Sequence, residues 1–255
     1  MGKLDGKVII VSGASSGIGA GTAEVLADEG AKVVIFARSS KLDATSQKLE
    51  AKGYDFLALR GDATSEEDWA NIVKQAVAKY GRIDGLFNNA GGYDNLAKAD
   101  ATYFGDNFSL DAWHDQFEKQ FFSQLKGIRA CLPELRKTKG CIICNSSITV
   151  VRSVSVSAYA CAKAAALTLV KSLAKELGPE GIRINCVIPG WVKSHLTPYF
   201  DSPDDPIGQI LNAQTWLEHH PGEPADVGHA VAFLASDDAK YLTGIEIIVD
   251  GGFSL

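Results

Sequence analysis

The 255-residue sequence predicts one α/β domain, built on a doubly wound parallel sheet of about seven strands with helices on both faces. Two observations predict it. Short apolar runs rich in Val and Ile alternate along the chain with helical stretches, as in consecutive βαβ units. No Pro-, Gly- or Ser-rich linker and no internal repeat divides the chain, so we expect a single domain over residues 1–255. Ligands of such sheets bind beyond the carboxyl ends of the strands, so the residues that follow each strand form the candidate site.

Each expected strand is a short apolar run that ends at glycine or at polar residues. The first, KVIIVSG at 7–13, precedes a helix over Ile18–Glu29 that ends at Gly30. The second is AKVVIFAR at 31–38, a polar helix follows through Leu49, and the third is DFLALRGD at 55–62. A helix over 69–81 then leads to IDGLFNNAG at 83–91, CIICNSS at 141–147, IRINCVIPG at 182–190 and IEIIVDGG at 245–252. Apolar strands separated by helices indicate a parallel sheet covered on both faces, which is a Rossmann-like arrangement.

Composition and charge argue against several classes of protein. A formal net charge of −6 and the lack of a long Lys/Arg run argue against a nucleic-acid partner. The chain shows no secretory signal and no apolar run of membrane-spanning length, so we expect a cytoplasmic protein without a membrane partner. Its five cysteines are expected to be reduced, and Cys141 and Cys144 would face opposite sides of a strand. The histidines show no ligand spacing, so no metal site is expected.

A glycine-rich turn follows the first expected strand. SGASSGIGAG, from Ser12, has glycines at 13, 17 and 19, a spacing that differs from GxGxxG but has the same mechanical uses. Gly13 permits a tight turn, Gly17 lets the backbone approach a phosphate, and Gly19 lets the helix pack on the strand. The helix that begins there presents free N–H groups and a partial positive charge. The turn therefore predicts a dinucleotide site.

The segment SAYACAK, at 157–163, places a phenol and an ammonium four residues apart among small side chains. On a helix, Tyr159 and Lys163 would share one face. They are a candidate acid and the cation that tunes its pKa. Alone, the same spacing also fits an amphipathic helix with a surface lysine and a half-buried tyrosine, so the rest of the chain must decide.

Five motifs, in this order, resemble the short-chain dehydrogenase/reductase family: SGASSGIG near the N-terminus, NNAG at 88–91, NSS at 145–147, YACAK at 159–163 and PG at 189–190. The resemblance covers nearly the whole chain. It implies an enzyme that interconverts a secondary alcohol and a ketone with a nicotinamide cofactor. Tyr159 would be the general acid/base, and Lys163 would lower the pKa of Tyr159 and hold the nicotinamide ribose. The alternative is a nucleotide-binding module with little or no turnover.

A serine at the end of the fifth strand would, by the same resemblance, donate a hydrogen bond to the substrate oxygen. Counting back from Tyr159 by the usual gap of the family selects Ser146, whereas matching the strand GCIICNSS selects Ser147. We favour Ser147, because the pleat of a strand fixes which side chain faces the cofactor, whereas loop lengths vary. Ser147, Tyr159 and Lys163 are therefore the expected catalytic residues.

One family residue is replaced in this chain. Aligned by Trp113 and Pro133, Gln120 stands where the family usually has an asparagine that helps to hold a proton-relay water. Glutamine keeps the amide but extends it by a methylene. This departure puts the relay in doubt and is the only support for the module without turnover.

The resemblance implies the other cofactor contacts. Asp62 and Ala63 would lie at the adenine, although Asp62 also fits a helix-capping turn. Asn89 would lie beside the ribose, and Val192 with Ser194 at the nicotinamide amide. The full expected cofactor set is Gly13, Ser15, Ser16, Gly17, Ile18, Gly19, Arg38, Ser39, Asp62, Ala63, Asn89, Ala90, Gly91, Tyr159, Lys163, Pro189, Gly190, Val192 and Ser194.

The residues after the second strand predict NADP(H) as the cofactor. Enzymes of this architecture that use NAD place an acidic residue there, where it binds the ribose hydroxyls and repels a 2′-phosphate. This chain has Ala37 at that position, followed by Arg38, whose guanidinium can bind phosphate through paired hydrogen bonds. Ser39 and Ser16 would add hydroxyl donors. The alternative is that Arg38 is a solvated surface charge.

Two aromatic-rich segments predict the substrate class. One lies between Gly91 and Trp113, with Tyr93, Tyr103, Phe104 and Phe108, and the other follows the sixth strand, with Trp191, Tyr199, Phe200 and Trp216. Because both would overhang the nicotinamide, we expect a small apolar or aromatic carbonyl or alcohol, unless these rings only pack the loops. The helix at 113–132 and the helix that begins near Tyr159 are association helices in the family, so a homodimer or homotetramer is expected.

Overall fold

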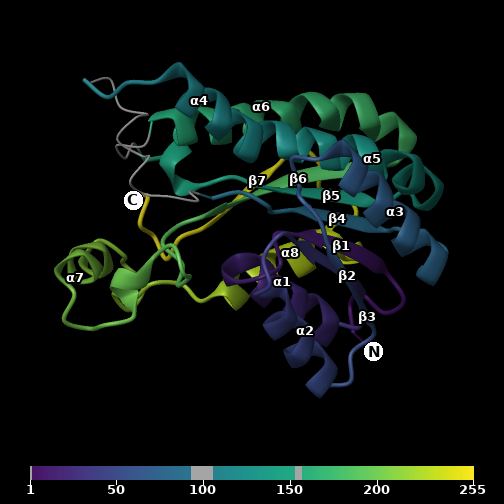
Figure 1. Ribbon diagram of the computed structural model, residues 1–255, viewed down its shortest axis with the longest axis horizontal. Helices are drawn as coiled ribbons and strands as arrows, with labels where there is room; N and C mark the ends of the chain where they lie inside the picture. The colour runs from purple at the N-terminus through teal and green to yellow at the C-terminus, as the bar shows by residue number, and fades with distance from the viewer. Residues whose placement is uncertain (1, 93–105, 153–156) are drawn as a thin grey trace.

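The computed structural model describes residues 2–92, 106–152 and 157–255. Its seven strands are β1 (Val8–Ser12), β2 (Lys32–Ala37), β3 (Phe56–Arg60), β4 (Gly85–Asn88), β5 (Cys141–Asn145), β6 (Arg183–Pro189) and β7 (Glu246–Val249). The helices are α1 (Gly17–Asp28), α2 (Leu42–Ala51), α3 (Glu66–Tyr80), α4 (Leu110–Phe117), α5 (Ser123–Thr138), α6 (Ser157–Leu177), α7 (Pro206–Ala213) and α8 (Pro224–Ala235). Strands and helices alternate through most of the chain, and the predicted fold class is confirmed (Figure 1).

The seven strands form one parallel sheet in the order β3-β2-β1-β4-β5-β6-β7. The chain runs outward from β1 to β3, then returns to the other side of β1 with β4. The order of the strands therefore reverses between β1 and β4, and the connections that leave these two strands diverge there. In open α/β sheets, this switch point is where a ligand crevice forms.

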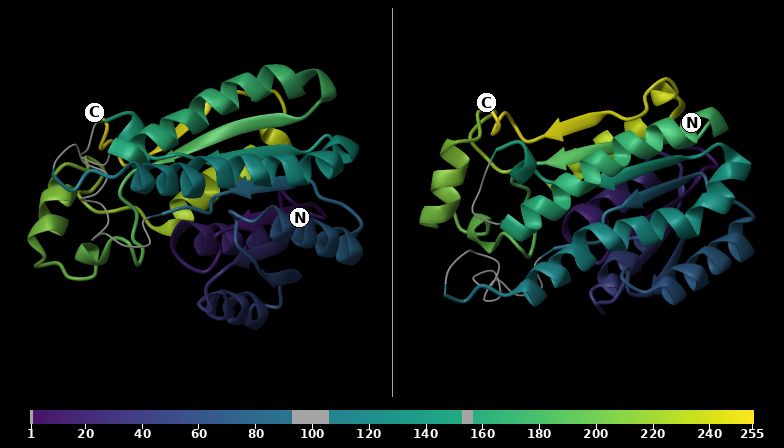
Figure 2. Two further views of the ribbon diagram at one scale, coloured as in Figure 1. Left: turned by 45° about the horizontal axis from the view of Figure 1, so that its top comes forward. Right: turned by 90° about the horizontal axis from the view of Figure 1, so that it is seen from above.

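Two apolar layers enclose the sheet because successive strand residues face opposite sides. On β1, Ile9 and Val11 pack with residues of α1 and α8, whereas Val8 and Ile10 pack on the side of α3 and α5. Figures 1 and 2 show α1, α2 and α8 on one face and α3, α5 and α6 on the other. Burial of each Val or Ile side chain contributes roughly 1.5–3 kcal/mol, so this two-sided core holds the strand ends in fixed positions.

The stretch after β4 differs from the continuous helix that its sequence suggests. α4 and α5 are joined by a π-helical turn over Glu118–Phe122, which includes Gln120. Hydrophobic periodicity does not reveal such a turn, because one extra residue in a single turn leaves the apolar face almost continuous. The turn lies beside the carboxyl ends of β4 and β5.

Among the described residues, no helix combines the length and the apolar character needed to cross a bilayer. α7 and the adjacent segments project beyond the carboxyl edge of the sheet, on the same side as the strand-end motifs (Figure 2).

Candidate active site

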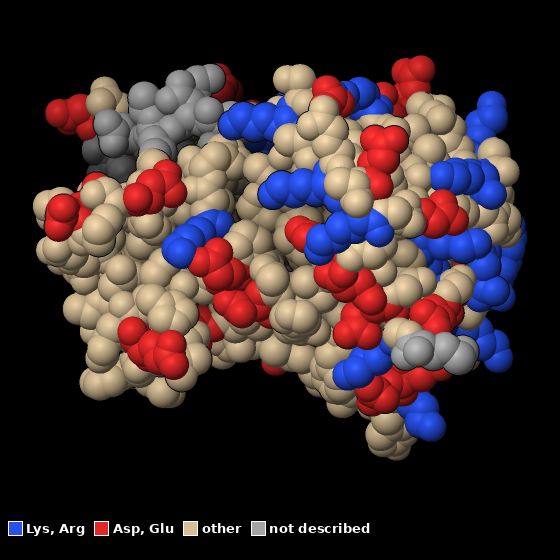
Figure 3. All heavy atoms as spheres, turned by 90° about the horizontal axis from the view of Figure 1, so that it is seen from below, with Lys and Arg blue, Asp and Glu red and all other residues tan. Residues whose placement is uncertain are grey.

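A cavity of about 320 Å³ lies at the carboxyl ends of the central strands. Residues that follow β1, β2, β3, β4 and β6 line it, together with residues of β5, α6 and the π-helical turn. Figure 3 shows the hollow between the two halves of the molecule, with Lys and Arg side chains beside it. The structure brings to this cavity every residue of the expected cofactor set except Pro189 and Gly190.

The glycine-rich turn is closely packed, and this packing leaves no room for a Cβ at two of its glycines. A Cβ on Gly13 would lie 2.8 Å from the Ala90 Cα, and one on Gly19 would lie 2.3 Å from the Gly13 carbonyl oxygen. Gly13 and Gly17 also have φ values of +69° and +53°, which favour glycine. At the start of α1, the side chain of Ser16 caps no backbone N–H group, and the first turn has no acidic residue. The helix N-terminus therefore keeps donors and positive potential for an anionic group.

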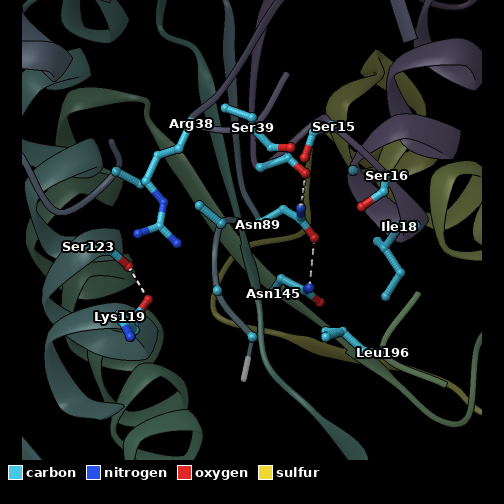
Figure 4. A pocket seen from close by; sticks show the side chains of 18 of the residues that line it. Ser15, Ser16, Ile18, Arg38, Ser39, Asn89, Lys119, Ser123, Asn145 and Leu196 are labelled. Carbon is cyan, nitrogen blue, oxygen red and sulfur yellow. Dashed lines mark hydrogen bonds between the residues drawn. The ribbon is translucent and has the colours of Figure 1, made fainter. Parts of the chain in front are cut away.

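At the end of β2, Arg38 lies beside the cavity with Asp62. Its Nη1 is 3.5 Å from the Asp62 Oδ2, and the arginine side chain is 55% exposed. Asp62 also forms the expected turn, because its Oδ1 accepts hydrogen bonds from the Thr64 N–H and hydroxyl at 2.8 Å each. The structure thus confirms the turn, and Asp62 also lines the cavity, where contact with an adenine stays a prediction. Figure 4 shows Arg38 on the cavity wall, apart from Ser15 and Ser16.

Asn89 fastens the turn after β4 to the turn after β1. Its Nδ2 donates to the Ser12 carbonyl oxygen at 2.9 Å, and its Oδ1 accepts from the Asn145 Nδ2 at 2.9 Å. Ser12 completes the link, since its hydroxyl accepts from the N–H groups of Asn89 and Ala90 at 2.9 Å each. Three strand ends are thus held in one hydrogen-bonded unit, part of which is visible in Figure 4.

The two adjacent serines after β5 have different surroundings. The Ser146 hydroxyl is buried and donates to the Lys163 backbone carbonyl at 3.1 Å. The Ser147 hydroxyl makes a hydrogen bond with Tyr159. Burial raises the pKa of Tyr159, and the hydrogen bond from Ser147 opposes that shift. Ser147 is not in the cavity wall itself but reaches the site through Tyr159.

Lys163 is 2% exposed and points toward the carboxyl end of β5. Its Nζ donates to the Asn145 backbone carbonyl at 2.9 Å and lies 5.7 Å from the centroid of the Tyr159 ring. Burial lowers the pKa of Lys163 from 10.5 to about 8. The lysine is therefore a buried cation at neutral pH, which excludes the alternative of a surface lysine.

Gln120 lies in the π-helical turn and is fully buried in the cavity wall. Its Nε2 donates to the Gly92 carbonyl at 2.9 Å, while its buried Oε1 accepts no hydrogen bond from the described part of the chain. A Cβ on Gly91 would lie 2.4 Å from that oxygen. The longer amide is thus fitted against a backbone that has no side chain at position 91.

The segment after β6 borders the cavity and contacts the glycine-rich turn. Val192 and Ser194 line the cavity, whereas Pro189 pairs with β7 and the Gly190 N–H donates to Val249 at 2.8 Å. His195 is a lining residue that the sequence did not reveal. Its Nδ1 lies 3.0 Å from the Ser16 hydroxyl, and burial, together with the charge of Lys41, lowers its pKa. No motif marks His195, because the contact joins segments 179 residues apart.

The aromatic segments are placed only in part. Tyr93, Tyr103 and Phe104 lie outside the described residues. Phe108 contacts Trp113, and Trp191 contacts Tyr199 and Phe253 edge to face, at centroid distances of 6.2 and 5.9 Å. None of these described rings lines the cavity, and Trp216 is 68% exposed. They pack within and between the loops around the site.

The cysteines form no disulfide among the described residues, and Cys141 and Cys144 are buried on β5. Burial raises the pKa of Cys131, Cys141 and Cys144, so these thiols pack as small apolar groups. In the described parts of the chain, no cluster of three or more His, Cys, Asp or Glu side chains has the arrangement of a metal site.

The residues that line the cavity suit a dinucleotide chemically. The close-packed glycine turn and the uncapped start of α1 suit a diphosphate, and Arg38 and Asp62 border one end of the cavity. Tyr159 and Lys163 lie at the other wall, where a phenol can exchange a proton and a buried ammonium can stabilise the phenolate. The arrangement suits proton transfer to or from an oxygen beside a bound nucleotide.

Comparisons with known proteins agree with this geometry. A protein-family model described as enoyl-(acyl carrier protein) reductase matches residues 13–254. The chain is 35% identical to oxidoreductase UcpA of Salmonella typhimurium, over 100% of this chain and 97% of that protein. It resembles the structure of a Caenorhabditis elegans short-chain dehydrogenase/reductase of unknown function with cofactor, at a TM-score of 0.88 and 29% identity, over 99% and 96% of the two chains. A 7α-hydroxysteroid dehydrogenase complexed with NADH and 7-oxo glycochenodeoxycholic acid matches with a TM-score of 0.87 and 29% identity, over 98% and 94%.

Proposed function

Since this chain belongs to the short-chain dehydrogenase/reductase family and is an NAD(P)-dependent oxidoreductase, we propose that it interconverts a secondary alcohol and a ketone with NADP(H). The observation that carries the proposal is the set Ser147, Tyr159 and Lys163, of which Tyr159 and Lys163 line the cavity and Ser147 hydrogen-bonds to Tyr159. When bound, the cofactor supplies or accepts the hydride. The chain supplies binding, orientation and the proton.

Tyr159 donates its phenolic proton to the ketone oxygen during reduction, and takes one back during oxidation. Because burial raises its pKa, the phenol is protonated at neutral pH and is ready to act as an acid. Ser147 already hydrogen-bonds to Tyr159, so a substrate oxygen that lies between the two hydroxyls receives both donors. The positive charge of Lys163 favours the phenolate that forms when the proton leaves.

Arg38 supports the choice of NADP(H) over NAD(H). The carboxylate that would bind ribose hydroxyls at the end of β2 is absent, because Ala37 occupies that position. The Arg38 guanidinium borders the cavity, and its side chain is 55% exposed, so a phosphate of the cofactor could reach it there. The similar 7α-hydroxysteroid dehydrogenase was solved with NADH, which makes a direct comparison of the two cofactors necessary.

We further propose that the substrate is a small apolar or aromatic carbonyl compound or alcohol. Val192 and Leu196 line the cavity, and Trp191, Tyr199 and Phe253 pack on one another beside this segment without lining it. Apolar side chains in a cavity wall bind apolar surface better than charged groups.

The test is the loss of NADPH absorbance with a panel of apolar and aromatic ketones, for the wild type and for Tyr159→Phe. We expect turnover that falls by about 100-fold or more in the variant, while the Kd for NADPH stays nearly unchanged, because the change deletes the proton but keeps the ring. Tight NADPH binding without oxidation by any carbonyl would favour the alternative, a nucleotide-binding module. A variant with the rate of the wild type at neutral pH would remove Tyr159 from its role.

A further inference from the structure

The backbone carbonyl of Asn145, at the end of β5, accepts two buried donors. One is the Lys163 Nζ at 2.9 Å, and the other is the side-chain Nε2 of Gln124 at 3.0 Å. Gln124 is fully buried, and Lys163 is 2% exposed. The carbonyl that anchors the Lys163 ammonium is therefore itself held by a glutamine that no motif marks.

Gln124 ties this carbonyl to the π-helical turn. Its Nε2 also donates to the Gln120 backbone carbonyl at 3.0 Å, and its own backbone carbonyl accepts from the Asn88 Nδ2 at 2.6 Å. Both neighbours of the Gln124 amide are carbonyl oxygens, which can only accept hydrogen bonds. The nitrogen must therefore face them, so chemistry fixes the orientation of this amide.

Stability alone does not explain an amide at this position. Among the described residues, none donates a hydrogen bond to the buried Gln124 Oε1, and a buried acceptor without a donor destabilises the folded state by about 1–3 kcal/mol. A methionine or leucine would fill similar space without that penalty. The residue that is present instead supplies two donors to two backbone carbonyls at the site.

We propose that Gln124 is a positioning residue for Lys163. It acts through the Asn145 carbonyl, which it holds at a fixed distance from the π-helical turn. This inference rests on the proposed function, since Lys163 is the cation that favours the Tyr159 phenolate. Nothing in the geometry requires Gln124 to touch substrate or cofactor.

Three variants test the proposal with matched chemistry. Gln124→Met keeps the length of the side chain but removes both donors. Gln124→Ala removes the side chain and leaves space at the former nitrogen position, where a water can donate to both carbonyls. Gln116→Met is the control, because Gln116 lies on α4 and is 6% exposed. Among the described residues its buried Oε1 also has no hydrogen-bond partner, and no hydrogen bond joins Gln116 to Asn145 or Lys163.

We expect the kcat of Gln124→Met to fall by about 10-fold, with KM for the ketone and the melting temperature close to those of the wild type. Gln124→Ala should keep a kcat within about 3-fold of the wild type, because water replaces the amide. Gln116→Met should keep the wild-type kcat. If Gln124 only filled space in the core, the order of the two kcat values would be reversed, because Gln124→Ala removes more packing than Gln124→Met. A kcat of Gln124→Met equal to that of Gln116→Met, or Gln124→Ala more impaired than Gln124→Met, overturns the proposal.

Crystal structures of the two Gln124 variants give a readout that does not depend on the reaction. In Gln124→Ala we expect a water within hydrogen-bond distance of the carbonyls of Gln120 and Asn145, with Lys163 in place. In Gln124→Met we expect the Asn145 carbonyl or the Lys163 Nζ to have moved. An unmoved lysine in Gln124→Met overturns the positioning role even if the wild type reduces ketones. The opposite combination is also informative. If Lys163 is displaced in Gln124→Met but Tyr159→Phe reduces ketones at the wild-type rate, then Gln124 positions the lysine and the proposed function is wrong.

Discussion

Ser146 and Ser147 are neighbours in the sequence, yet their hydroxyl groups have different hydrogen-bond partners. Ser146 donates to the backbone of α6, whereas Ser147 meets the phenol of Tyr159. We predict that Ser147→Ala lowers kcat by about 100-fold, because it removes a donor aimed at the substrate oxygen. Ser146→Ala should instead lower the free energy of unfolding by about 1 kcal/mol and leave most of the turnover. Kinetics and urea unfolding of both variants check this, and a larger kcat loss in Ser146→Ala would reverse the assignment.

Lys163 predicts a particular dependence of stability on pH. Burial lowers its pKa to about 8 in the folded protein, below the ordinary value of 10.5 that the unfolded chain keeps. Between these values the unfolded chain binds more protons, so the contribution of Lys163 to the free energy of unfolding rises with pH. The difference between the wild type and Lys163→Met should therefore increase by about 2 kcal/mol from about pH 8 to 9.5. A difference that stays constant over this range would mean that the lysine keeps its ordinary pKa.

Arg38 and Ala37 are predicted to decide the choice of cofactor. A charge-assisted contact contributes roughly 1.5–3 kcal/mol, so kcat/KM with NADPH should exceed that with NADH by about 10- to 100-fold. Arg38→Ala combined with Ala37→Asp should reverse the preference, because the carboxylate binds ribose hydroxyls and repels the phosphate. Initial rates with both cofactors at one salt concentration measure the ratio. Equal or better use of NADH by the unmodified protein would end the phosphate-binding role of Arg38.

At the scale of elements, the π-helical turn places Gln120 where its amide reaches the Gly92 carbonyl. Asparagine is one methylene shorter, so Gln120→Asn should lose this hydrogen bond and lower the free energy of unfolding by about 1 kcal/mol. If the position also supports a water relay, the variant should keep the wild-type kcat or exceed it slightly. A large loss of kcat would show that the relay, or the packing of the helix, depends on the longer amide.

The strands and their ends could be predicted from the sequence because they follow from local patterns. A buried β-branched run such as VIIVS, closed by a glycine turn, fixes both the strand and the edge of the sheet where Gly13 and Asn89 meet. The contacts of Gln124 and His195 could not be predicted. Gln124 follows the π-helical turn on α5 and reaches Asn145 on β5, and His195 reaches Ser16 across most of the chain. Such contacts depend on the packing of elements and leave no short-range pattern.

At the scale of the whole molecule, we propose a homodimer or homotetramer that buries the outer face of α5. On this face Phe122 is 42% and Leu125 is 37% exposed, beside the half-buried Phe117 and Phe121. Phe122→Glu with Leu125→Glu should convert the oligomer to a monomer, because each carboxylate would be desolvated in the interface. Light scattering at micromolar concentration measures the mass, with Ile207→Glu on α7 as the control. A wild-type monomer, or an assembly that survives the double change, would place the interface elsewhere or remove it.

The close fit between Gly91 and Gln120 also bears on which residues this site can accept over generations. Any Cβ at position 91 would lie 2.4 Å from the Gln120 Oε1, and the φ of +157° at Gly91 disfavours every other residue. An alanine at 91 therefore requires both a displaced Gln120 amide and a strained backbone. Shortening residue 120 removes the first cost but leaves the second. The identity of residue 120 can thus vary while position 91 stays glycine, because the backbone conformation at 91 keeps this loop without a side chain.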